Sequence, residues 1–385
     1  MSRKVCVVIT ARPSYSRVRS LLRAIKNHPE LELQLVVAAS ALLDRYGSVH
    51  TVIEREGFHI DRRVYNIFEG ENLLTSAKST GMGIVELASA FSELAPDMVV
   101  TIADRFETIA TAIAASYQNI PLVHIQGGEV SGSIDEKVRH AITKLADLHF
   151  VSSARAAERV IRMGERSDRV YDTGCPSIDV VVDALAKPPL STSELFERYG
   201  GVGDTLNLDD AYVVVIQHPV TTQYEASRRQ VLETLHAIAE SGVPTLWFWP
   251  NVDAGSDGTS GGIRAYREEH SLPHVHFFKN LPPDDFLRLI DRSRGIVGNS
   301  SVAIRECAFM GVPAVNIGNR QRGRDRGRNV IDVEHDRKQI RDAIDRCVAA
   351  GRFESDLLYG DGESGVRIAD HLVTVPLSVE KTLTY

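Results

Sequence analysis

Cysteine and aromatic residues are scarce in this chain of 385 residues. The 4 cysteines stand far apart, and none lies in a CxxC or Cys/His spacing that is typical of a zinc site. Phe, Trp and Tyr together make up 6% of the chain. These absences argue against a disulfide-stapled scaffold and against a zinc module. They favour reduced thiols that mostly fill the core of a cytoplasmic protein, at Cys6, Cys175, Cys307 and Cys347.

Long apolar segments are missing as well. No run approaches the ~18 residues that a bilayer-spanning helix needs. The segment MSRKVCVVITARPSYSRV holds only about six apolar residues before polar ones return, which is short for a signal-peptide core and fits a first β-strand. The formal net charge of −7 would repel nucleic acid and an anionic membrane, so we expect neither as a partner.

What the sequence has is a regular alternation of short β-rich runs and longer segments of helical period. A chain that is 43% hydrophobic and 25% charged can bury a large core, and this length suggests about two domains. The alternation predicts an α/β fold with parallel sheets covered by helices on both faces. In the first half, the predicted strands are Val5–Ile9, Leu33–Ala38, Met98–Ile102, Leu122–Ile125 and His149–Ser152, and the predicted helices are Arg17–Lys26, Phe106–Ser116, Glu136–Ala146 and Arg155–Met163.

A segment rich in proline, glycine and acidic residues interrupts this alternation at 187–210 and is typical of a linker. We therefore expect two doubly wound, Rossmann-like domains over 1–187 and 211–362, with a tail over 363–385 that packs back near the N-terminal domain. Ligands of such folds bind at the carboxyl ends of the strands. In the second half, the predicted strands are Tyr212–Ile216, Thr245–Phe248, His274–Phe277, Gly295–Gly298 and Ala314–Ile317, and the predicted helices are Glu225–Glu240, Ile263–Glu269, Pro283–Asp291, Ile304–Phe309 and Asp336–Ala350.

Charged side chains follow two predicted strands of the first half. Arg12 could clamp a phosphate and Ser16 could cap the next helix, although a plain strand–turn–helix with a surface arginine fits as well. Asp104 and Arg105 come directly after another strand. A carboxylate beside a guanidinium suits a base that its neighbour keeps ionised, whereas the plain alternative is an aspartate at the start of a helix.

The next strand leads into the segment HIQGGEVSGSIDEK. Its adjacent glycines let the backbone approach a ligand closely. Gln126 and Glu129 flank these glycines, and Ser133 with Glu136 fits a capping box. Asp135 either favours the helix dipole or serves as an acid/base group.

Polar residues also follow strands in the second half. A lone histidine is more often structural than catalytic, but the position of His218 after a strand favours a functional role. Asn251 and Asp253 follow the next strand, before a glycine-rich loop.

Ser300 and Ser301 lie at the start of the helix that is predicted after the strand Gly295–Gly298. Amides and hydroxyls at a helix start can bind a diphosphate, and Glu306 further along could accept both hydroxyls of a ribose. The alternative is an N-cap with a surface glutamate. The arginine-rich segment 320–328 could bind nucleic acid, but a solvated loop with Arg320 reaching a phosphate fits an acidic chain better.

Together these segments resemble the hydrolysing UDP-N-acetylglucosamine 2-epimerases of sialic-acid biosynthesis, especially the epimerase half of the animal bifunctional epimerase/kinase. The resemblance runs from about residue 4 to residue 362, and its most specific part is the block around GGEVSG and RHAITK. The matching segments are LLDRYG, DRFETIA, HIQGGEVSGSIDEKVRHAITKLA, DTGCPSID, QHPVTT, PNVDAGS, GNSSVAIRE, GNRQRGR and YGDG.

The resemblance implies a glycosyltransferase-B-like fold with the active site in the cleft between two domains, UDP held by the C-terminal domain, and no metal or other cofactor. It makes Asp104 and Asp135 acid/base carboxylates and counts His218 among the catalytic candidates. By the same resemblance, Arg12, Ser16 and Arg105 face the sugar, and His218, Asn251, Asp253, Ser300, Ser301, Glu306 and Arg320 belong to the nucleotide side.

Three positions depart from the family pattern, and one of them is Asn280, where the animal enzyme has a histidine. Gln126 stands where a third carboxylate is usual, and an amide can orient a hydroxyl or water but cannot accept a proton. Glu129 is retained and is a candidate to cover part of that role. Ser14 stands in place of an acid in the N-terminal motif. These changes leave UDP binding nearly intact and put the sugar in question.

The implied reaction converts UDP-N-acetylglucosamine and water to N-acetylmannosamine and UDP through a 2-acetamidoglucal. One alternative is the same reaction on UDP-2,4-diacetamido-trideoxyhexose, as in legionaminic-acid pathways. Another is a catalytically inactive protein that binds UDP-sugars, and a glycosyltransferase is the alternative at the level of the fold. Since oligomers are usual in the family, we expect a homodimer or homotetramer.

Overall fold

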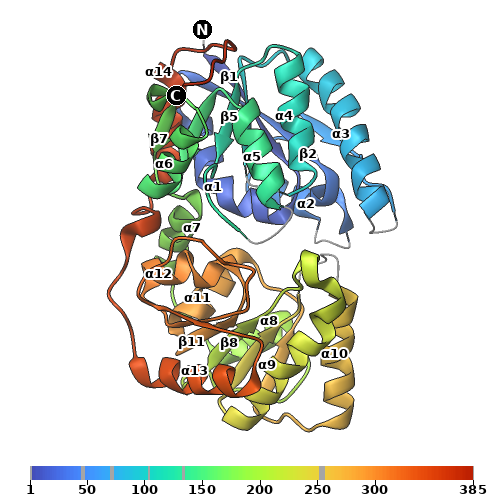
Figure 1. Cartoon of the computed structure of the whole chain (residues 1–385), viewed down its shortest axis with the longest axis vertical. Coiled ribbons are helices and arrows are strands. Elements are labelled where there is room, and N and C mark those ends of the chain that lie inside the picture. Colours follow the sequence, from blue (N-terminus) through green and yellow to red (C-terminus); the bar gives the residue numbers. More distant parts are fainter. Residues whose placement is uncertain are drawn as a thin grey trace. The chain divides into compact units, whose positions relative to one another are not determined.

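The computed structural model of the chain divides into two units, each built on a parallel β-sheet (Figure 1). It describes residues 2–44, 48–69, 73–102, 105–131, 135–250 and 256–384. The first unit comprises Met1–Glu129, Ile134–Val180 and Gly360–Tyr385, and the second comprises Val130–Ser133 and Val181–Tyr359.

The first unit contains a sheet of 7 strands. The strands are β1 (Arg3–Ile9), β2 (Leu31–Ala38), β3 (Arg62–Val64), β4 (Met98–Ile102), β5 (Leu122–Ile125), β6 (Leu148–Val151) and β7 (Val170–Asp172). Their order in the sheet is β3-β2-β1-β4-β5-β6-β7, and neighbouring strands pair in parallel. The helices along this part of the chain are α1 (Arg12–Asn27), α2 (Val49–Arg55), α3 (Leu73–Leu94), α4 (Thr108–Tyr117), α5 (Asp135–Leu145), α6 (Ala154–Arg162), α7 (Pro176–Leu185) and α14 (Ser364–Thr374), with short 3-10 helices η1 (Ala39–Leu42) and η3 (Ser167–Arg169).

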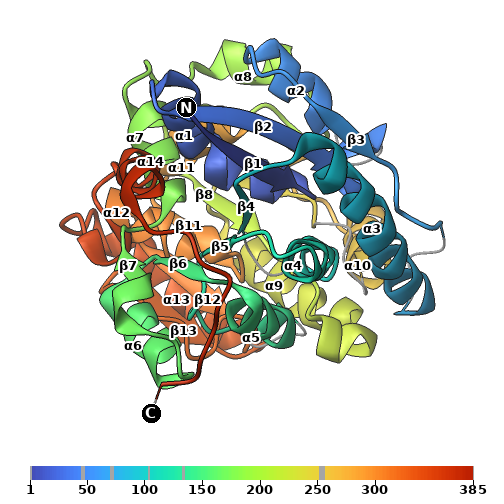
Figure 2. The ribbon, with the colours of Figure 1, turned by 90° about the horizontal axis from the view of Figure 1, so that it is seen from above.

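Both faces of this sheet are buried, because the strands are apolar at nearly every position. Val7 and Ile9 point to the face that α1 and α14 cover, whereas Cys6 and Val8 belong to the core shared with α3, α4 and α5. This alternation explains why the strands appear in the sequence as continuous apolar runs. The view from above shows α3 and α4 side by side (Figure 2).

The C-terminal segment belongs to the first unit. Helix α14 packs against α1, and the Arg3 guanidinium donates hydrogen bonds to the carbonyl oxygens of Leu372 and Val375, both at 2.8 Å. Lys381 reaches the carbonyl of Thr143 at 3.2 Å, and Thr384 N–H donates to Gly164 O at 3.1 Å. The tail is therefore anchored along its length to the elements around β6.

The second unit repeats the arrangement with a sheet of 6 strands. The strands are β8 (Val213–Ile216), β9 (Thr245–Phe248), β10 (Val275–Phe278), β11 (Gly295–Gly298), β12 (Ala314–Ile317) and β13 (Val330–Val333). Their order is β10-β9-β8-β11-β12-β13, again parallel. The helices are α8 (Thr192–Tyr199), α9 (Ser227–Ser241), α10 (Ser256–Glu269), α11 (Pro283–Arg292), α12 (Glu306–Met310) and α13 (Arg337–Ala350), with 3-10 helices η4 (Thr221–Ala226), η5 (Ser301–Ala303) and η6 (Leu357–Tyr359).

The structure differs from the sequence-based prediction at several elements. Helices α2, α3, α7 and α14 and the edge strands β3, β7 and β13 were not predicted, and the predicted linker contains helix α8. The predicted start of the first helix at Arg17 was also wrong, because α1 begins at Arg12. Pro13 lies in its first turn, where the fixed φ of proline suits a helix and its missing N–H costs nothing.

No helix in the described ranges has both the length and the apolar character that crossing a bilayer requires.

Candidate functional site

In each sheet there is one pair of neighbouring strands from which the strand order runs outward in opposite directions. In the first unit this point lies between β1 and β4, and in the second between β8 and β11. At such a point the loops at the carboxyl ends diverge and leave room for a ligand. The predicted residues Arg12, Arg105, His218 and Ser300 follow these four strands. The topology of each unit therefore supports the positions from which the sequence led us to expect chemistry.

Arg12 and Ser16 lie in the first turns of α1. Burial lowers the pKa of the Arg12 guanidinium, which is the expected effect when a charge loses part of its hydration. The predicted cap at Ser16 is wrong. The residue before the helix is Ala11, and the Ser16 hydroxyl donates to the carbonyl of Arg12 at 3.3 Å. Ser16 thus lies on the helix and does not satisfy amides at its start.

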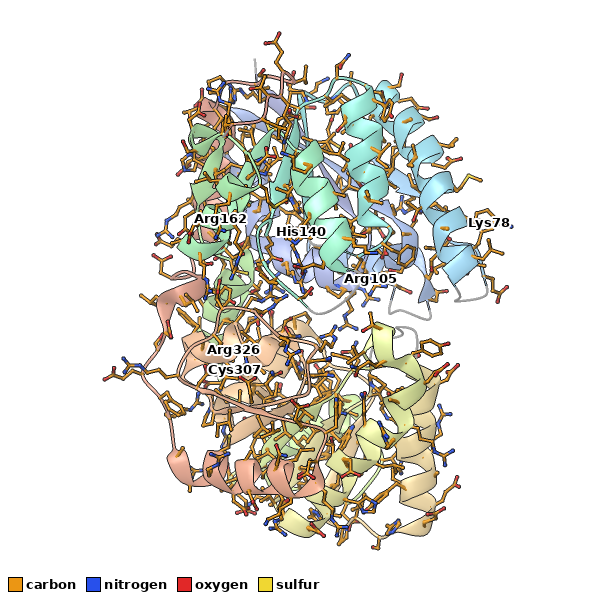
Figure 3. The ribbon with its side chains drawn as sticks, in the orientation of Figure 1. Lys78, Arg105, His140, Arg162, Cys307 and Arg326 are labelled. Atoms are coloured by element: carbon orange, nitrogen blue, oxygen red, sulfur yellow. The ribbon has the colours of Figure 1, made fainter. Side chains whose placement is uncertain are left out.

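Arg105 forms an ion pair with a carboxylate that the sequence analysis did not single out. Its Nε lies 3.0 Å from Oε1 of Glu107, whose side chain is only 1% exposed. The second oxygen of Glu107 is buried and has no hydrogen-bond partner in the described part of the chain. Next to it, the hydroxyls of Thr10 and Thr108 lie 3.5 Å apart and connect the end of β1 with the start of α4. Figure 3 labels Arg105 at the lower end of this unit.

Gln126 is buried and has a left-handed backbone, with φ of 67°. Its N–H still pairs with Phe150 O at 2.9 Å, so the strained residue continues the sheet. Arg17 Nη1 donates to Gln126 Oε1 at 3.4 Å, and Gln126 Nε2 donates to Cys175 Sγ at 2.9 Å. Cys175 is therefore more than core filling, because it helps to orient this amide.

Glu129 is held in place by hydrogen bonds to its side chain and its backbone. The Ser152 hydroxyl donates to Glu129 Oε1 at 2.9 Å, and the buried Arg139 donates to the Glu129 carbonyl at 2.8 Å. Gly128 lies at a φ of 74°, and a Cβ there would fall 2.2 Å from the carbonyl of Ala156. Only glycine fits this close approach, which explains one glycine of the GGE segment.

Four predicted site residues lie wholly or partly outside the described residues. Asp104, Asn251 and Asp253 lie outside the described residues, as does Ser133 of the expected capping box. Asp135 is the first residue of α5, but its side chain lies outside the description. Along the same helix, Glu136 pairs with Arg139 and with His140, both at 2.9 Å.

In the second unit, Asn299 joins the loops that follow β8 and β11. Its Oδ1 accepts the His218 N–H at 2.7 Å, and its Nδ2 donates to the His218 carbonyl at 2.8 Å. Its own carbonyl accepts from Arg320 at 3.0 Å and from Gln321 at 2.9 Å. His218 and Arg320, which are far apart in the sequence, are thus both hydrogen-bonded to the buried Asn299, His218 to its side chain and Arg320 to its backbone carbonyl.

Ser300 and Ser301 do not start the α-helix that the sequence predicted. They begin the 3-10 turn η5, and α12 starts only at Glu306. Ser300 Oγ accepts from Val302 N–H at 3.4 Å, and Ser301 Oγ accepts from the buried Arg305 at 3.0 Å. Such side-chain hydrogen bonds compete with a regular helix.

Glu306 is a buried carboxylate with unused hydrogen-bonding capacity. Its side chain is 8% exposed, and Oε2 lies 3.9 Å from Nε of Arg305. That oxygen has no hydrogen-bond partner among the described residues. Buried polar atoms are normally paired, so an unpaired carboxylate oxygen in this place suits a ligand hydroxyl. The alternative of a surface glutamate is wrong.

The arginine-rich segment is less solvated than predicted. Arg324 is only 8% exposed, and Arg326 forms an ion pair with Asp332 on β13. Since only part of this segment faces solvent, it does not form a continuous basic surface. Within the described ranges, no group of three or more His, Cys, Asp or Glu side chains could hold a metal ion.

The second unit thus combines a cation, hydroxyls and a buried carboxylate, which suits a nucleoside diphosphate. Comparison with known proteins shows the family of the chain. A family model described as UDP-N-acetylglucosamine 2-epimerase matches residues 23–373. A UDP-N-acetylglucosamine 2-epimerase of Neisseria meningitidis is 30% identical over 94% of this chain and 92% of that protein.

Two further comparisons extend over nearly the whole chain. A UDP-N,N'-diacetylbacillosamine 2-epimerase (hydrolyzing) of Legionella pneumophila is 31% identical over 98% of this chain and 97% of that protein. The crystal structure of the UDP-GlcNAc 2-epimerase of Neisseria meningitidis bound to UDP-GlcNAc superimposes with a TM-score of 0.80, at 18% identity, over 97% of this chain and 100% of that one. The structural likeness confirms the α/β fold with two glycosyltransferase-B-like units.

Proposed function

Since the chain belongs to the UDP-N-acetylglucosamine 2-epimerase family, we propose that it is a hydrolysing member that converts UDP-N-acetylglucosamine and water to N-acetylmannosamine and UDP. Hydrolysis is favoured by the block from His124 to Ala146, which resembles the hydrolysing enzymes. It is favoured also by the similarity to the Legionella protein, whose name specifies a hydrolysing reaction.

The observation that carries the proposal is the unpaired, buried Oε2 of Glu306 in the cluster that follows β11. A carboxylate there can accept hydrogen bonds from ribose hydroxyls, while Ser301 and Arg320 bind the diphosphate. Holding the diphosphate matters for the reaction itself, because charge builds up on it as it leaves the sugar.

Removal of the proton at C2 of the sugar is difficult, because no carbonyl group adjoins that carbon. We propose that a carboxylate takes this proton while the C1–O bond to UDP breaks. The electron pair of the C–H bond then forms the C1–C2 double bond of a 2-acetamidoglucal. Water adds its oxygen to C1, and a proton returns to C2 from the opposite face. The products are N-acetylmannosamine and UDP, and two acid/base groups on opposite faces are required.

Asp104 and Asp135 are the proposed acid/base pair. In the sequence, Asp104 follows β4, and Asp135 is the first residue of α5 after the loop that follows β5. Arg105 next to Asp104 would favour its ionised form. Gln126, fixed by Arg17 and Cys175, would orient a sugar hydroxyl or the attacking water without accepting a proton. Glu129 would support this arrangement from the adjacent loop.

A second candidate substrate is UDP-2,4-diacetamido-trideoxyhexose. The similarity to the Legionella protein, which is named for a diacetylated sugar, favours it. The chemistry at C1 and C2 would be identical, because the two donors differ only in the substituents at C4 and C6. The residues that hold UDP and move protons would therefore keep their roles, and only contacts to the far side of the sugar would change.

The test is to incubate the purified protein with each donor in heavy water and to follow the products by proton NMR. We expect equal amounts of UDP and free 2-epimeric sugar, with deuterium at C2. Release of UDP-N-acetylmannosamine in place of the free sugar would contradict hydrolysis. UDP binding without turnover of either donor would support an inactive UDP-sugar-binding protein instead. The donor with the larger kcat/KM identifies the substrate.

A further inference from the structure

Gln126 combines a buried side chain with a backbone conformation that few residues adopt. It is only 3% exposed, and its φ of 67° falls in the left-handed region. That region is costly for a residue with a Cβ atom, and residues held in it concentrate where ligands bind. The residue before it, Ile125, is in register with Ile102, the last residue of β4. Gln126 therefore lies beside the end of β4, where the topology of the first sheet leaves room for a ligand.

Two side chains from other segments fix the orientation of this amide. Nη1 of Arg17 on α1 lies 3.4 Å from Oε1, and Sγ of Cys175, which follows β7, lies 2.9 Å from Nε2. A guanidinium can only donate, so the atom that faces Arg17 must be the oxygen. The Cys175 thiol can in turn donate to Ser177 Oγ, 3.0 Å away, and keep its lone pairs for the amide. The oxygen and the nitrogen of Gln126 therefore cannot exchange places.

One hydrogen of this amide has no partner within the protein. Nε2 carries two N–H groups, and Cys175 accepts one of them. Among the residues that the structure describes, none accepts the other. Buried N–H groups nearly always have an acceptor, so this second N–H suits an acceptor on a ligand. A carboxylate of the same size would offer lone pairs only, so the amide supplies something that a glutamate could not.

The acceptor that depends most on such a donor is the carbonyl oxygen of an acetamido group. A sugar hydroxyl can donate as well as accept, so it can bind either an amide or a carboxylate. An acetamido carbonyl can only accept, and it loses its hydrogen bond when only lone pairs face it. Both candidate donors carry an acetamido group at C2, and UDP-2,4-diacetamido-trideoxyhexose carries another at C4.

We propose that Gln126 donates its second N–H to the carbonyl oxygen of an acetamido group of the sugar, and that Cys175 is a positioning residue that holds the amide for this contact. The inference rests on the proposed function, because it takes a UDP-linked amino sugar as the ligand. It assigns to the first unit a group that recognises the N-acetyl substituent, while the nucleotide is assigned to the second unit.

The test uses analogues that cannot react, in which CH2 replaces the oxygen between C1 and the diphosphate. Calorimetric titration compares the analogues of UDP-2,4-diacetamido-trideoxyhexose, UDP-N-acetylglucosamine and UDP-glucose. Gln126→Glu keeps the size of the side chain but removes the donor. We expect about tenfold weaker binding of each analogue whose acetamido group contacts residue 126, and little change for the glucose analogue and for UDP. A loss for both acetamido analogues places the contact at C2, and a loss for the diacetamido analogue alone places it at C4.

A matched control removes an amide donor elsewhere in the same unit. Gln118 Nε2 donates to Ala88 O at 2.9 Å, at the other end of α4. Gln118→Glu should therefore leave the binding of all three analogues unchanged. Equal thermal unfolding of the variants shows that a loss of binding does not come from a loss of folding.

Cys175→Ala is an independent test, because it leaves Gln126 itself in place. The amide loses one of its two constraints, so we expect the same acetamido analogues to bind about threefold more weakly. Cys175→Ser should recover part of this loss, since a hydroxyl can accept from Nε2. In the Gln126→Glu background, Cys175→Ala should have no further effect. Cys347→Ala, at another buried cysteine, is the control.

Three results would overturn the proposal: an equal effect of Gln126→Glu on all three analogues, unchanged binding of the acetamido analogues by that variant, or unchanged binding by Cys175→Ala. The proposed reaction is tested separately, because these analogues bind without turnover. If the binding pattern holds and neither donor is turned over, the proposed reaction is wrong and this inference stands. If a donor is turned over and the pattern is absent, the reaction stands and this inference is wrong.

Discussion

Arg105 Nε donates a hydrogen bond of 3.0 Å to Glu107 Oε1, and the side chain of Glu107 is 1% exposed. This pair lies directly after β4, beside the position of Asp104. A buried carboxylate needs a nearby cation, because its charge has lost most of its hydration. The pair therefore fixes the guanidinium that adjoins the proposed acid/base residue, and Glu107 is a positioning residue in this account.

Glu107→Gln should lower kcat by about tenfold while the affinity for UDP stays the same. The amide keeps a hydrogen bond to Arg105 but removes the charge that holds it, so the arginine becomes less well placed. Steady-state kinetics and calorimetric titration with UDP measure the two effects. Glu93→Gln, which disrupts the exposed pair with Arg62, is the control. An unchanged kcat in the Glu107→Gln enzyme would show that Glu107 does not position Arg105 for the reaction.

Asp104→Asn and Asp135→Asn should each lower turnover by a factor of about 10² to 10⁴, the usual contribution of a positioned acid or base. The affinity for UDP should hardly change, because the proposed nucleotide site belongs to the second unit. Single-turnover kinetics and UDP titration test this, with Asp168→Asn in an exposed ion pair as the control. Near-normal turnover in either variant would exclude that residue from the acid/base pair.

Glu306→Gln should weaken UDP binding by about tenfold, since a hydrogen bond to a charged acceptor contributes about 1.5–3 kcal/mol. The same substitution should weaken the binding of 2′-deoxy-UDP less, because this ligand lacks one of the two hydroxyls that the carboxylate would accept. Comparing both ligands with both proteins isolates that contact. Glu354→Gln at an exposed position is the control. An equal loss for the two ligands would argue against ribose binding at Glu306.

A cluster around Glu165 makes the first unit sensitive to acid. Burial by itself would raise the pKa of Glu165, but hydrogen bonds from His149, Lys144 and Lys381 outweigh this and lower it to about 2. Lys144 lies 2.6 Å and Lys381 2.5 Å from the carboxylate. The folded state thus binds fewer protons here than the unfolded state. Its contribution, on the order of 3 kcal/mol, is present above the ordinary pKa near 4.3 and is lost as the pH falls toward 2.

Lys381→Met should therefore reduce this acid sensitivity and loosen the tail at neutral pH. Amide hydrogen exchange in β6 reports on the cluster, because His149 belongs to that strand. We expect faster exchange in the variant at pH 7 and a smaller additional loss of protection, compared with the wild type, when the pH is lowered to 3. Lys338→Met serves as the control. If the variant matched the wild type at both values, the cluster would have no role in stability.

The sequence predicted the buried strands well. Those at 245–248, 295–298 and 314–317 have the predicted bounds, because a strand covered on both faces is mostly apolar and stands out as a short continuous run. Helix α8 was missed although its signal was present. The Ser191 hydroxyl accepts from the Glu194 N–H at 3.2 Å, the start of a capping box within a segment assigned as linker.

Helix α3 was missed for a different reason. Its outer face is nearly as apolar as its inner face and contains glycine, so the helical period is blurred in the sequence.

The amino-acid sequence by itself determined the α/β class, the parallel sheets and the family, since these depend on the order of apolar runs and on motifs that are continuous in the chain. Only the tertiary structure decided which side chains are buried together. Three examples show this: His218 is hydrogen-bonded to Asn299, the carboxylates of Glu107 and Glu306 are buried, and Gln126 is hydrogen-bonded to Cys175. The residues next to them in the sequence do not predict these contacts or this burial. Burial and charge pairing arise from packing between distant segments, and that information is absent from any local stretch of sequence.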